Sequence, residues 1–223
     1  MKYIKNYNED VIKNFLKYFS IELTCFTTIL GGIIAQEVIK ATGKFIPIEQ
    51  YLFFDFYNIS ENLKENENIA LLPKDRYFYI NTIFGQKIIS NLQNKKILLV
   101  GTGALGCELL KIFSLLGIKN VTAVDNDLIE LSNLNRQFLF RKENIGKSKA
   151  EISCCAALNM NHELENYKPI VNKISNETEE LFNKNFWYNT DILLCAIDTL
   201  KGRLYLDSRC KIFEIPIING GTN

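Results

Sequence analysis

Three glycines and one aspartate have the types and spacing to bind a nucleotide. Gly101, Gly103 and Gly106 follow an apolar run, and Asp125 lies nineteen positions after the last of them. Glycines let the backbone approach phosphate closely, and the N-terminus of a following helix offers unpaired N–H groups. A carboxylate at this distance can accept hydrogen bonds from ribose hydroxyls. The pattern predicts a nucleotide site, although tight packing turns produce the same glycines.

A second group of polar residues separates the possible nucleotide chemistries. Asn133, Asn135, Arg136 and Lys149 follow in a segment for which a dehydrogenase has no obvious use. A guanidinium and an ammonium suit phosphate oxygens, so Arg136 and Lys149 favour an enzyme that handles a triphosphate. Without the surrounding motif, solvated surface charges or ion-pair partners would be the favoured interpretation of both residues.

Asp198 is the third candidate, and it follows a predicted strand at residues 191–196. It therefore lies at the carboxyl edge of the predicted sheet, where open α/β folds bind ligands. Its carboxylate could hold Mg²⁺ against phosphates there. Capping of the following helix is the alternative, and the two roles can coexist.

The elements that must position these residues form an α/β pattern. Apolar β-type runs and helix-period segments alternate after residue 75, which is typical of a mostly parallel sheet with helices on both faces. The predicted strands span residues 96–100, 121–125, 167–172, 191–196 and 216–219. The predicted helices span residues 104–116, 147–159, 178–183 and 199–213.

The first 74 residues predict a separate part of the chain. Residues 10–19 and 27–41 have helical spacing, residues 51–56 resemble a strand, and residues 58–73 are polar and acidic. The apolar residues 25–35 are too few to span a membrane and predict a buried helix. We predict three regions, namely a segment of a neighbouring domain at residues 1–57, a linker at 58–74 and the α/β domain at 75–223.

The amino-acid composition limits the expected binding partners and the expected cellular compartment. A formal net charge of +1 gives no global reason to expect nucleic acid or a membrane as partner. The six cysteines form no C-x-x-C pair, and the first ten residues lack the apolar core of a secretory signal. These features favour reduced thiols in a cytoplasmic or nuclear protein.

The region after residue 75 resembles the adenylation domain of ubiquitin-activating enzymes and their relatives. The resemblance is carried by VGTGALGCELLK, VDNDLIELSNLNRQFLFR, IGKSKAE, AIDTLKGR and PIINGGT. The stretch SNLNRQFLFR is long and makes the match much more specific than the glycines do. The resemblance implies a Rossmann-like adenylation fold of the ThiF and MoeB type.

The amino-terminal part resembles a different piece of the same family. Residues 22–55, followed by DRYFYINTIFGQ, are similar to the end of the inactive adenylation half and the start of the active half in single-chain ubiquitin-activating enzymes. Two-chain activators carry these halves on separate polypeptides, so the fusion favours the ubiquitin type. The chain ends directly after a predicted strand, which indicates a fragment.

The resemblance implies adenylation of the carboxyl terminus of ubiquitin by ATP and Mg²⁺. It also implies a later thioester on a cysteine outside this chain and a ubiquitin-conjugating enzyme bound through other domains, so we expect little turnover from these residues alone. Asp198 is implied as the metal ligand, and Arg136, Lys149 and Asp198 as the catalytic set. The implied nucleotide-contacting residues are Gly101, Gly103, Ala104, Gly106, Asp125, Asp127, Asn133, Arg136, Gln137, Lys149, Asp198 and Thr199.

One departure from the family pattern concerns the nucleotide site. The family usually has asparagine after the metal-linked aspartate, whereas this chain has Thr199, which shortens or removes one polar contact. Three other functions stay open. They are activation of another ubiquitin-like protein, noncatalytic binding of ubiquitin and, from the glycines and Asp125 alone, NAD-dependent oxidoreduction.

Overall fold

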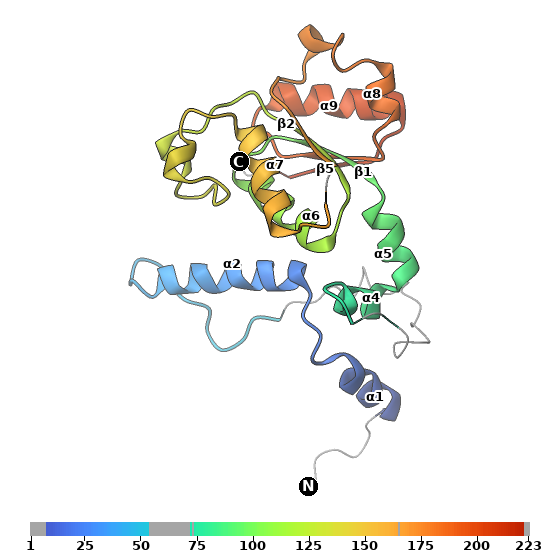
Figure 1. The fold of residues 1–223 in the computed structure, drawn as a ribbon. Helices are drawn as coiled ribbons and strands as arrows, with labels where there is room; N and C mark the ends of the chain where they lie inside the picture. Colours follow the sequence, from blue (N-terminus) through green and yellow to red (C-terminus); the bar gives the residue numbers. More distant parts are fainter. Residues whose placement is uncertain (1–7, 54–71, 73, 165, 221–223) are drawn as a thin grey trace. The chain divides into compact units, whose positions relative to one another are not determined.

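The structure is a computed structural model that describes residues 8–53, 72, 74–164 and 166–220. It contains two compact units, Met1–Ile89 and Ser90–Asn223, each of which is considered by itself. The second unit holds the sheet and all of the predicted site residues (Figure 1).

The second unit is built on a five-stranded, fully parallel sheet. The strands lie in the order β3-β2-β1-β4-β5, so β1 is central and its neighbours are β2 and β4. Their bounds are β1 Lys96–Val100, β2 Asn120–Val124, β3 Asn166–Ile170, β4 Ile192–Cys195 and β5 Ile217–Asn219. All five strands were predicted to within two residues at each end.

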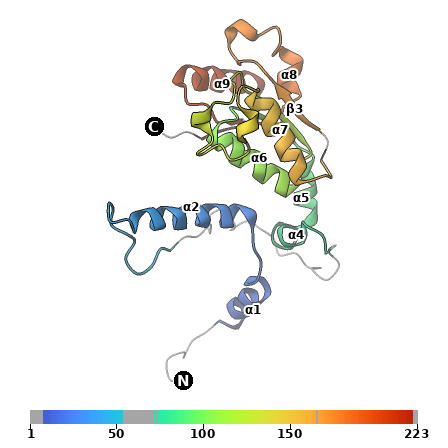
Figure 2. The ribbon, with the colours of Figure 1, turned by 60° about the vertical axis from the view of Figure 1, so that its left-hand side comes forward.

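Helices cover both faces of this sheet, which confirms the predicted fold class. Figure 1 shows α6 (Ala104–Leu116) and α7 (Lys149–Met160) on one face, with α8 (Lys184–Tyr188) and α9 (Leu200–Phe213) on the other. The turned view in Figure 2 shows the same arrangement. Within β1, Leu99 packs in the core with α6 and α7, whereas Leu98 packs in the core with α8 and α9. A strand buried on both faces reads as a continuous apolar run, as residues 97–100 do.

Side-chain hydrogen bonds fix the helices that flank the site. Ser148 caps α7 by accepting a hydrogen bond from the Glu151 N–H at 3.3 Å. The hydroxyl of Ser114 in α6 donates to the carbonyl oxygen of Ala157 in α7 at 2.8 Å. Gly117 ends α6 with a φ of 75°, the left-handed conformation that glycine adopts without strain.

The helix predicted at residues 178–183 is wrong. The structure has a 3₁₀ turn, η4 (Asn176–Thr178), then an irregular turn, and α8 begins only at Lys184. Two capping residues explain the difference, because Ser175 accepts from the Glu177 N–H and Asn183 accepts from the Phe186 N–H. Each cap starts its own short element, so one continuous helix cannot form.

The first unit is helical in the described residues. It contains α1 (Glu9–Tyr18), α2 (Thr24–Lys40) and α4 (Phe78–Phe84), and α5 (Gln86–Gln93) continues into the second unit. None of the helices in the described parts of the chain is long and apolar enough to cross a membrane.

Two predictions for the first unit are wrong where they can be compared. A buried helix was predicted at residues 25–35, but no residue of α2 is buried. Gly31 and Gly32 likewise have no atom within 4 Å of where a side chain would start, so nothing packs closely on them. Residues 51–53 form no strand, and residues 54–56 lie outside the described residues. An aromatic run needs a neighbouring strand to pair with, and the described strands all belong to the second unit. The linker at 58–74 lies mostly outside the described residues, so the domain division stays a prediction.

Candidate functional site: a cleft at the carboxyl edge of the sheet

The topology brings three loops to one place. Val100, the last residue of β1, pairs with Val124 at the end of β2 and with Cys195 at the end of β4. The loops that follow these strands therefore start at the same level of the sheet. They begin on both sides of β1, where the strand order reverses and open α/β folds bind their ligands.

These loops enclose a cleft with a volume of about 1190 Å³. That volume is large enough for a nucleotide with a further substrate group beside it. The structure therefore brings together all but one of the predicted site residues, since Gly106 does not line the cleft. The predicted residues in its lining are Gly101, Gly103, Ala104, Asp125, Asp127, Asn133, Arg136, Gln137, Lys149, Asp198 and Thr199.

The three glycines of the loop have different roles. Gly101 has a φ of +96°, and a Cβ on it would lie 2.7 Å from the carbonyl oxygen of Ala196. A Cβ on Gly106 would collide with the carbonyl oxygen of Gly101. Both glycines therefore allow backbone packing at the start of α6, and the contact of Gly106 with nucleotide stays a prediction. Gly103 alone faces open space, with only the side-chain nitrogen of Gln137 at 3.8 Å.

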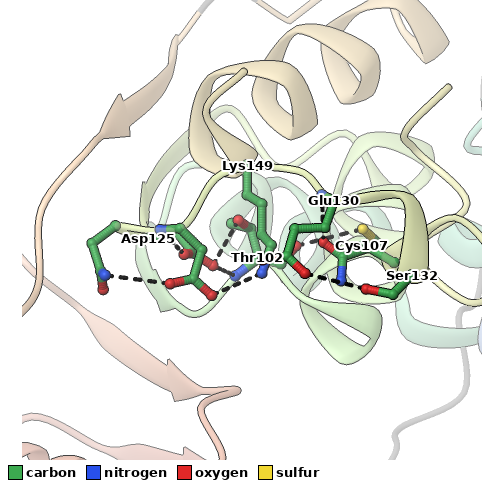
Figure 3. A network of polar contacts seen from close by, with 9 residues as sticks. Thr102, Cys107, Asp125, Glu130, Ser132 and Lys149 are labelled. Atoms are coloured by element: carbon green, nitrogen blue, oxygen red, sulfur yellow. Dashed lines mark hydrogen bonds and ion pairs between the residues drawn. The ribbon is translucent and has the colours of Figure 1, made fainter. Parts of the chain in front are cut away.

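Asp125 fixes the glycine loop to the end of β2. Its Oδ2 accepts hydrogen bonds from the N–H and the hydroxyl of Thr102, at 2.7 and 3.0 Å (Figure 3). Its Oδ1 accepts from the N–H of Asp127 at 2.9 Å. Each carboxylate oxygen can accept more than one hydrogen bond, so a ribose hydroxyl can still be bound. Asp125 thus shapes the loop in addition to lining the cleft.

Lys149 forms an ion pair inside the cleft. Its ammonium lies 2.8 Å from Oδ2 of Asp127, and its backbone N–H donates to the Asp127 carbonyl oxygen at 3.0 Å. The Lys149 side chain is only 10% exposed, whereas that of Asp127 is 58% exposed. The cation is therefore held in the cleft wall by a partner that stays accessible to solvent.

The segment between β2 and α7 presents Arg136 and Asn133. Asn133 ends the 3₁₀ turn η2 (Leu131–Asn133), is buried, and accepts from the Glu130 N–H at 3.0 Å. Arg136 is exposed, and its Nη1 donates to the Ser132 carbonyl oxygen at 3.0 Å and to Oδ1 of Asn135 at 3.1 Å. These contacts hold one nitrogen of the guanidinium and leave its other nitrogens available to an anion.

Gln137 is a buried polar residue in the same lining. It is 4% exposed, and its Oε1 has no hydrogen-bond partner among the described residues. An unpaired buried amide oxygen is costly, so such groups usually meet water or a ligand. The side-chain nitrogen of Gln137 faces Gly103, the one glycine of the loop that is open to the cleft.

Asp198 lies between β4 and α9 with its carboxylate unengaged. It is exposed, and within the described residues it accepts no hydrogen bond and forms no ion pair. The N-cap of α9 is Thr199, whose side chain makes no capping bond, so the alternative of Asp198 as a helix cap is wrong. An exposed carboxylate without a protein partner that lines the cleft has the chemistry of a metal ligand.

Comparison with known proteins places this site in a family. The ThiF family matches residues 78–223, about two thirds of the chain. The chain belongs to the ThiF family.

Curated relatives within the ThiF family are named as activating enzymes. Ubiquitin-activating enzyme E1 1 of Triticum aestivum is 41% identical over 225 residues, covering 96% of this chain and 21% of that protein. Ubiquitin-like modifier-activating enzyme 6 of Homo sapiens is 41% identical over 201 residues, covering 86% of this chain and 19% of that protein. The chain thus spans about a fifth of the length of these relatives. These similarities confirm the resemblance predicted from the sequence.

Solved structures agree on the ThiF-type fold. E. coli MccB with ATP is 27% identical, with a TM-score of 0.57 over 66% of this chain and 44% of that chain. E. coli tRNA N6-threonylcarbamoyladenosine dehydratase, TcdA, in complex with ATP is 22% identical, with a TM-score of 0.59 over 65% of this chain and 58% of that chain. The second likeness shows the fold alone.

Two cationic residues of the cleft were missed by sequence reasoning. Lys173 follows β3, and Arg203 lies in the first turn of α9, and both line the cleft. The position of Lys173, just past a predicted strand at the carboxyl edge, was the available signal. Arg203 belongs to the motif AIDTLKGR, but the sequence pattern predicted no contact for it.

The donor set fits Mg²⁺ bound together with phosphates. No cluster of three or more His, Cys, Asp or Glu side chains that could hold a metal ion exists in the parts of the chain that are described. Mg²⁺ is usually held by one or two carboxylates plus substrate phosphates, instead of by a cage of protein ligands. Asp198 can supply the carboxylate, and the open face at Gly103 leaves room for the phosphates.

Cys107 is not a nucleophile, despite its place in the first turn of α6. Its side chain is completely buried, and the thiol donates to the Thr102 carbonyl oxygen at 3.6 Å. Burial raises the pKa of Cys107 to about 12, so the reactive thiolate does not form near neutral pH. Cys107 therefore packs the helix against the sheet, as predicted.

Proposed function

We propose that this cleft binds ATP with Mg²⁺ and serves the adenylation of the C-terminal carboxylate of ubiquitin or a ubiquitin-like protein. One observation carries the proposal. Arg136, Lys149 and Asp198 come from three separate segments, and they line the same cleft beside a glycine loop that opens onto it at Gly103. Two cations and a free carboxylate suit a metal-bound polyphosphate, whereas a nicotinamide cofactor needs no such carboxylate.

Adenylation joins a carboxylate oxygen to the α-phosphorus of ATP and breaks the bond from that phosphorus to the bridging oxygen, so that pyrophosphate leaves. Negative charges approach one another in this step, and fixed cations lower its barrier. Lys149, held in the wall by Asp127, is placed to neutralise phosphate oxygens without first being ordered. Arg136 adds guanidinium donors from the cleft edge. Mg²⁺ held by Asp198 would supply further neutralisation of the phosphates when bound.

Other residues of the cleft orient the nucleoside. Asp125 can accept hydrogen bonds from ribose hydroxyls while it keeps the glycine loop attached through Thr102. The N-terminus of α6 lines the cleft at Gly103 and Ala104, where its free N–H groups can bind phosphates. Thr199 has the shorter side chain predicted to weaken one polar contact, and its hydroxyl makes no capping bond that would hold it away from the cleft.

The names of similar proteins support the proposed adenylation of ubiquitin or a ubiquitin-like protein. Enzymes named as activators of ubiquitin and of ubiquitin-like modifiers are 41% identical to this chain over most of its length. MccB, which is 27% identical, is named in complex with ATP. We further propose that the activated ubiquitin or ubiquitin-like protein is passed to a ubiquitin-conjugating enzyme, which binds through domains outside this chain. We also propose that the protein acts in the cytoplasm or nucleus.

The test is exchange of labelled pyrophosphate into ATP by the complete protein, with and without ubiquitin. We expect exchange that depends on ubiquitin and falls at least about tenfold in Lys149→Ala and in Asp198→Ala, as loss of a charged contact in the transition state implies. Lys147→Ala is the matched control, because Lys147 is exposed, lies two residues away and does not line the cleft. Unchanged exchange in both variants would refute the assigned roles, and no exchange with any ubiquitin-like protein would favour a noncatalytic binding module.

A further inference from the structure

Arg203 holds the backbone on both sides of Asp198. Its side-chain Nε donates a hydrogen bond to the carbonyl oxygen of Ile197 at 2.9 Å, and Ile197 directly precedes Asp198. Its backbone N–H donates to the carbonyl oxygen of Thr199 at 3.1 Å, and Thr199 directly follows Asp198. The bond to Thr199 is the ordinary main-chain bond of the first helical turn, so the bond to Ile197 is the one that depends on the Arg203 side chain.

No other side-chain hydrogen bond to the Ile197 carbonyl oxygen is present in the described residues. On the sheet side, the Ala196 N–H donates to the Val100 carbonyl oxygen at 2.8 Å, and the Ile197 side chain packs against the core of the second unit. On the helix side, Thr199 is the N-cap residue of α9 but its hydroxyl makes no capping bond. The Asp198 carboxylate has no partner of its own among the described residues. The direction of this carboxylate therefore depends on its backbone, whose Ile197 carbonyl oxygen is bound by the Arg203 side chain.

Close packing under the loop supports the same conclusion. A Cβ on Gly202 would lie 2.5 Å from Cδ1 of Ile197 and 2.9 Å from Oγ1 of Thr199. The absence of a side chain at residue 202 lets Ile197 lie directly over the first turn of α9. In that position its carbonyl oxygen is within reach of the Arg203 side chain.

Resting on the proposed function, we infer that Arg203 is a positioning residue that orients Asp198 for Mg²⁺ through the hydrogen bond from Nε to the Ile197 carbonyl oxygen. The two terminal nitrogens of Arg203 have no partner in the part of the chain that is described, and the residue lines the cleft. A direct contact with phosphate is the competing role, and it predicts a different response to substitution.

Two substitutions separate these roles. In Arg203→Gln the side-chain amide nitrogen takes the place of Nε along the side chain, so the donor is kept while the charge and both terminal nitrogens are lost. In Arg203→Met a side chain of similar reach has no donor at all. Both variants lose any phosphate contact equally, so a difference between them reports the hydrogen bond to Ile197.

The experiment is a calorimetric titration of the full 223-residue chain with ATP, once with Mg²⁺ and once with EDTA. The quantity compared is the factor by which Mg²⁺ tightens ATP binding. We expect Arg203→Met to reduce this factor by roughly fivefold to tenfold, since a lost hydrogen bond of this kind has about that effect. Arg203→Gln should keep most of it. Lys201→Ala, an exposed residue in the same helical turn, should leave it unchanged.

A double-mutant cycle completes the test. In the Asp198→Asn background, Arg203→Met should have little further effect on the Mg²⁺ factor, because the ligand that it positions is already gone. Equal losses in the Gln and Met variants, or losses that persist in EDTA, would overturn the positioning role in favour of a direct phosphate contact. Additive losses with Asp198→Asn would overturn it as well.

Failure of the inference can be told apart from failure of the proposed function. If the wild-type chain shows no tightening of ATP binding by Mg²⁺, the proposed metal role itself is wrong. If the wild-type chain shows it and Arg203→Met keeps it, only the role of Arg203 is wrong. Should Arg203→Met fail to fold by circular dichroism, the comparison of Arg203→Gln with wild type decides, because a Mg²⁺ factor reduced in Gln as much as in Asp198→Asn contradicts the inference.

Discussion

The ammonium of Lys149 and the carboxylate of Asp127 lie 2.8 Å apart, and the backbone N–H of Lys149 also donates to the Asp127 carbonyl oxygen. This double contact fixes a cation in the wall of the cleft before any ligand arrives. Lys149→Ala should therefore weaken ATP binding at least about tenfold, because it removes a preordered, mostly buried charge. Asp127→Ala should weaken binding less, since the cation remains. Calorimetry on both variants measures this, with Lys147→Ala as control, and equal affinity in wild type and Lys149→Ala would contradict it.

Substitution of Gly101 should cost far more stability than substitution of Gly146. Both have a left-handed φ, +96° and +83°, but only Gly101 would press a Cβ against backbone, 2.7 Å from the Ala196 oxygen. Gly146→Ala should lower the free energy of unfolding by about 1 kcal/mol from backbone strain alone. Gly101→Ala should lower it by about 3 kcal/mol or more, because the loop must also move. Urea unfolding of the two variants makes the comparison, and equal losses would show that the loop is not packed as described.

Asp125 should confer preference for ribose over deoxyribose. Its oxygens accept from Thr102 and Asp127, and they retain lone pairs for sugar hydroxyls. Wild type should bind ATP more tightly than 2′-deoxy-ATP, and Asp125→Asn should reduce that ratio by roughly fivefold, about one hydrogen bond. Because Asp125→Asn also disturbs the loop, the ratio of the two affinities is the informative measurement. A ratio unchanged from wild type would exclude the ribose contact.

Much of this architecture was predictable because its physical causes are local. Strands buried on both faces, such as residues 97–100, carry apolar residues at every position, and their alternation with helical segments indicates a parallel sheet. The convergence of Arg136, Lys149 and Asp198 was also predictable, since carboxyl ends of parallel strands meet at one edge.

The features that could not be predicted from the sequence depend on tertiary contacts that no local pattern encodes. The sequence does not indicate that the missing side chain of Gly106 makes room for the Gly101 carbonyl oxygen. The sequence alone does not distinguish a glycine that lines a ligand site from one that packs against neighbouring backbone. The hydrogen bond from Arg203 Nε to the Ile197 carbonyl oxygen likewise depends on how α9 packs against the sheet. The helix predicted at residues 178–183 failed because two caps compete within eight residues.

The buried thiols predict a loss of stability at high pH. Burial raises the pKa of Cys107 to about 12 from an ordinary value near 9. Between these values the unfolded chain releases a proton that the folded chain keeps, so the free energy of unfolding falls as pH rises. The fall from one thiol is up to about 1.4 kcal/mol per pH unit. Cys107→Ala should therefore flatten the dependence measured from pH 9 to 11, whereas Cys155→Ala, at an exposed position, should not. Identical slopes in wild type and Cys107→Ala would contradict the burial of this thiol.

The most direct test of the central claim is a pair of calorimetric titrations of the 223-residue chain, one with ATP and Mg²⁺ and one with NAD. The cleft described here should bind one ATP with Mg²⁺, lose most of that affinity in Lys149→Ala, and show no comparable response to NAD. Tight binding of NAD with no response to ATP would contradict the account.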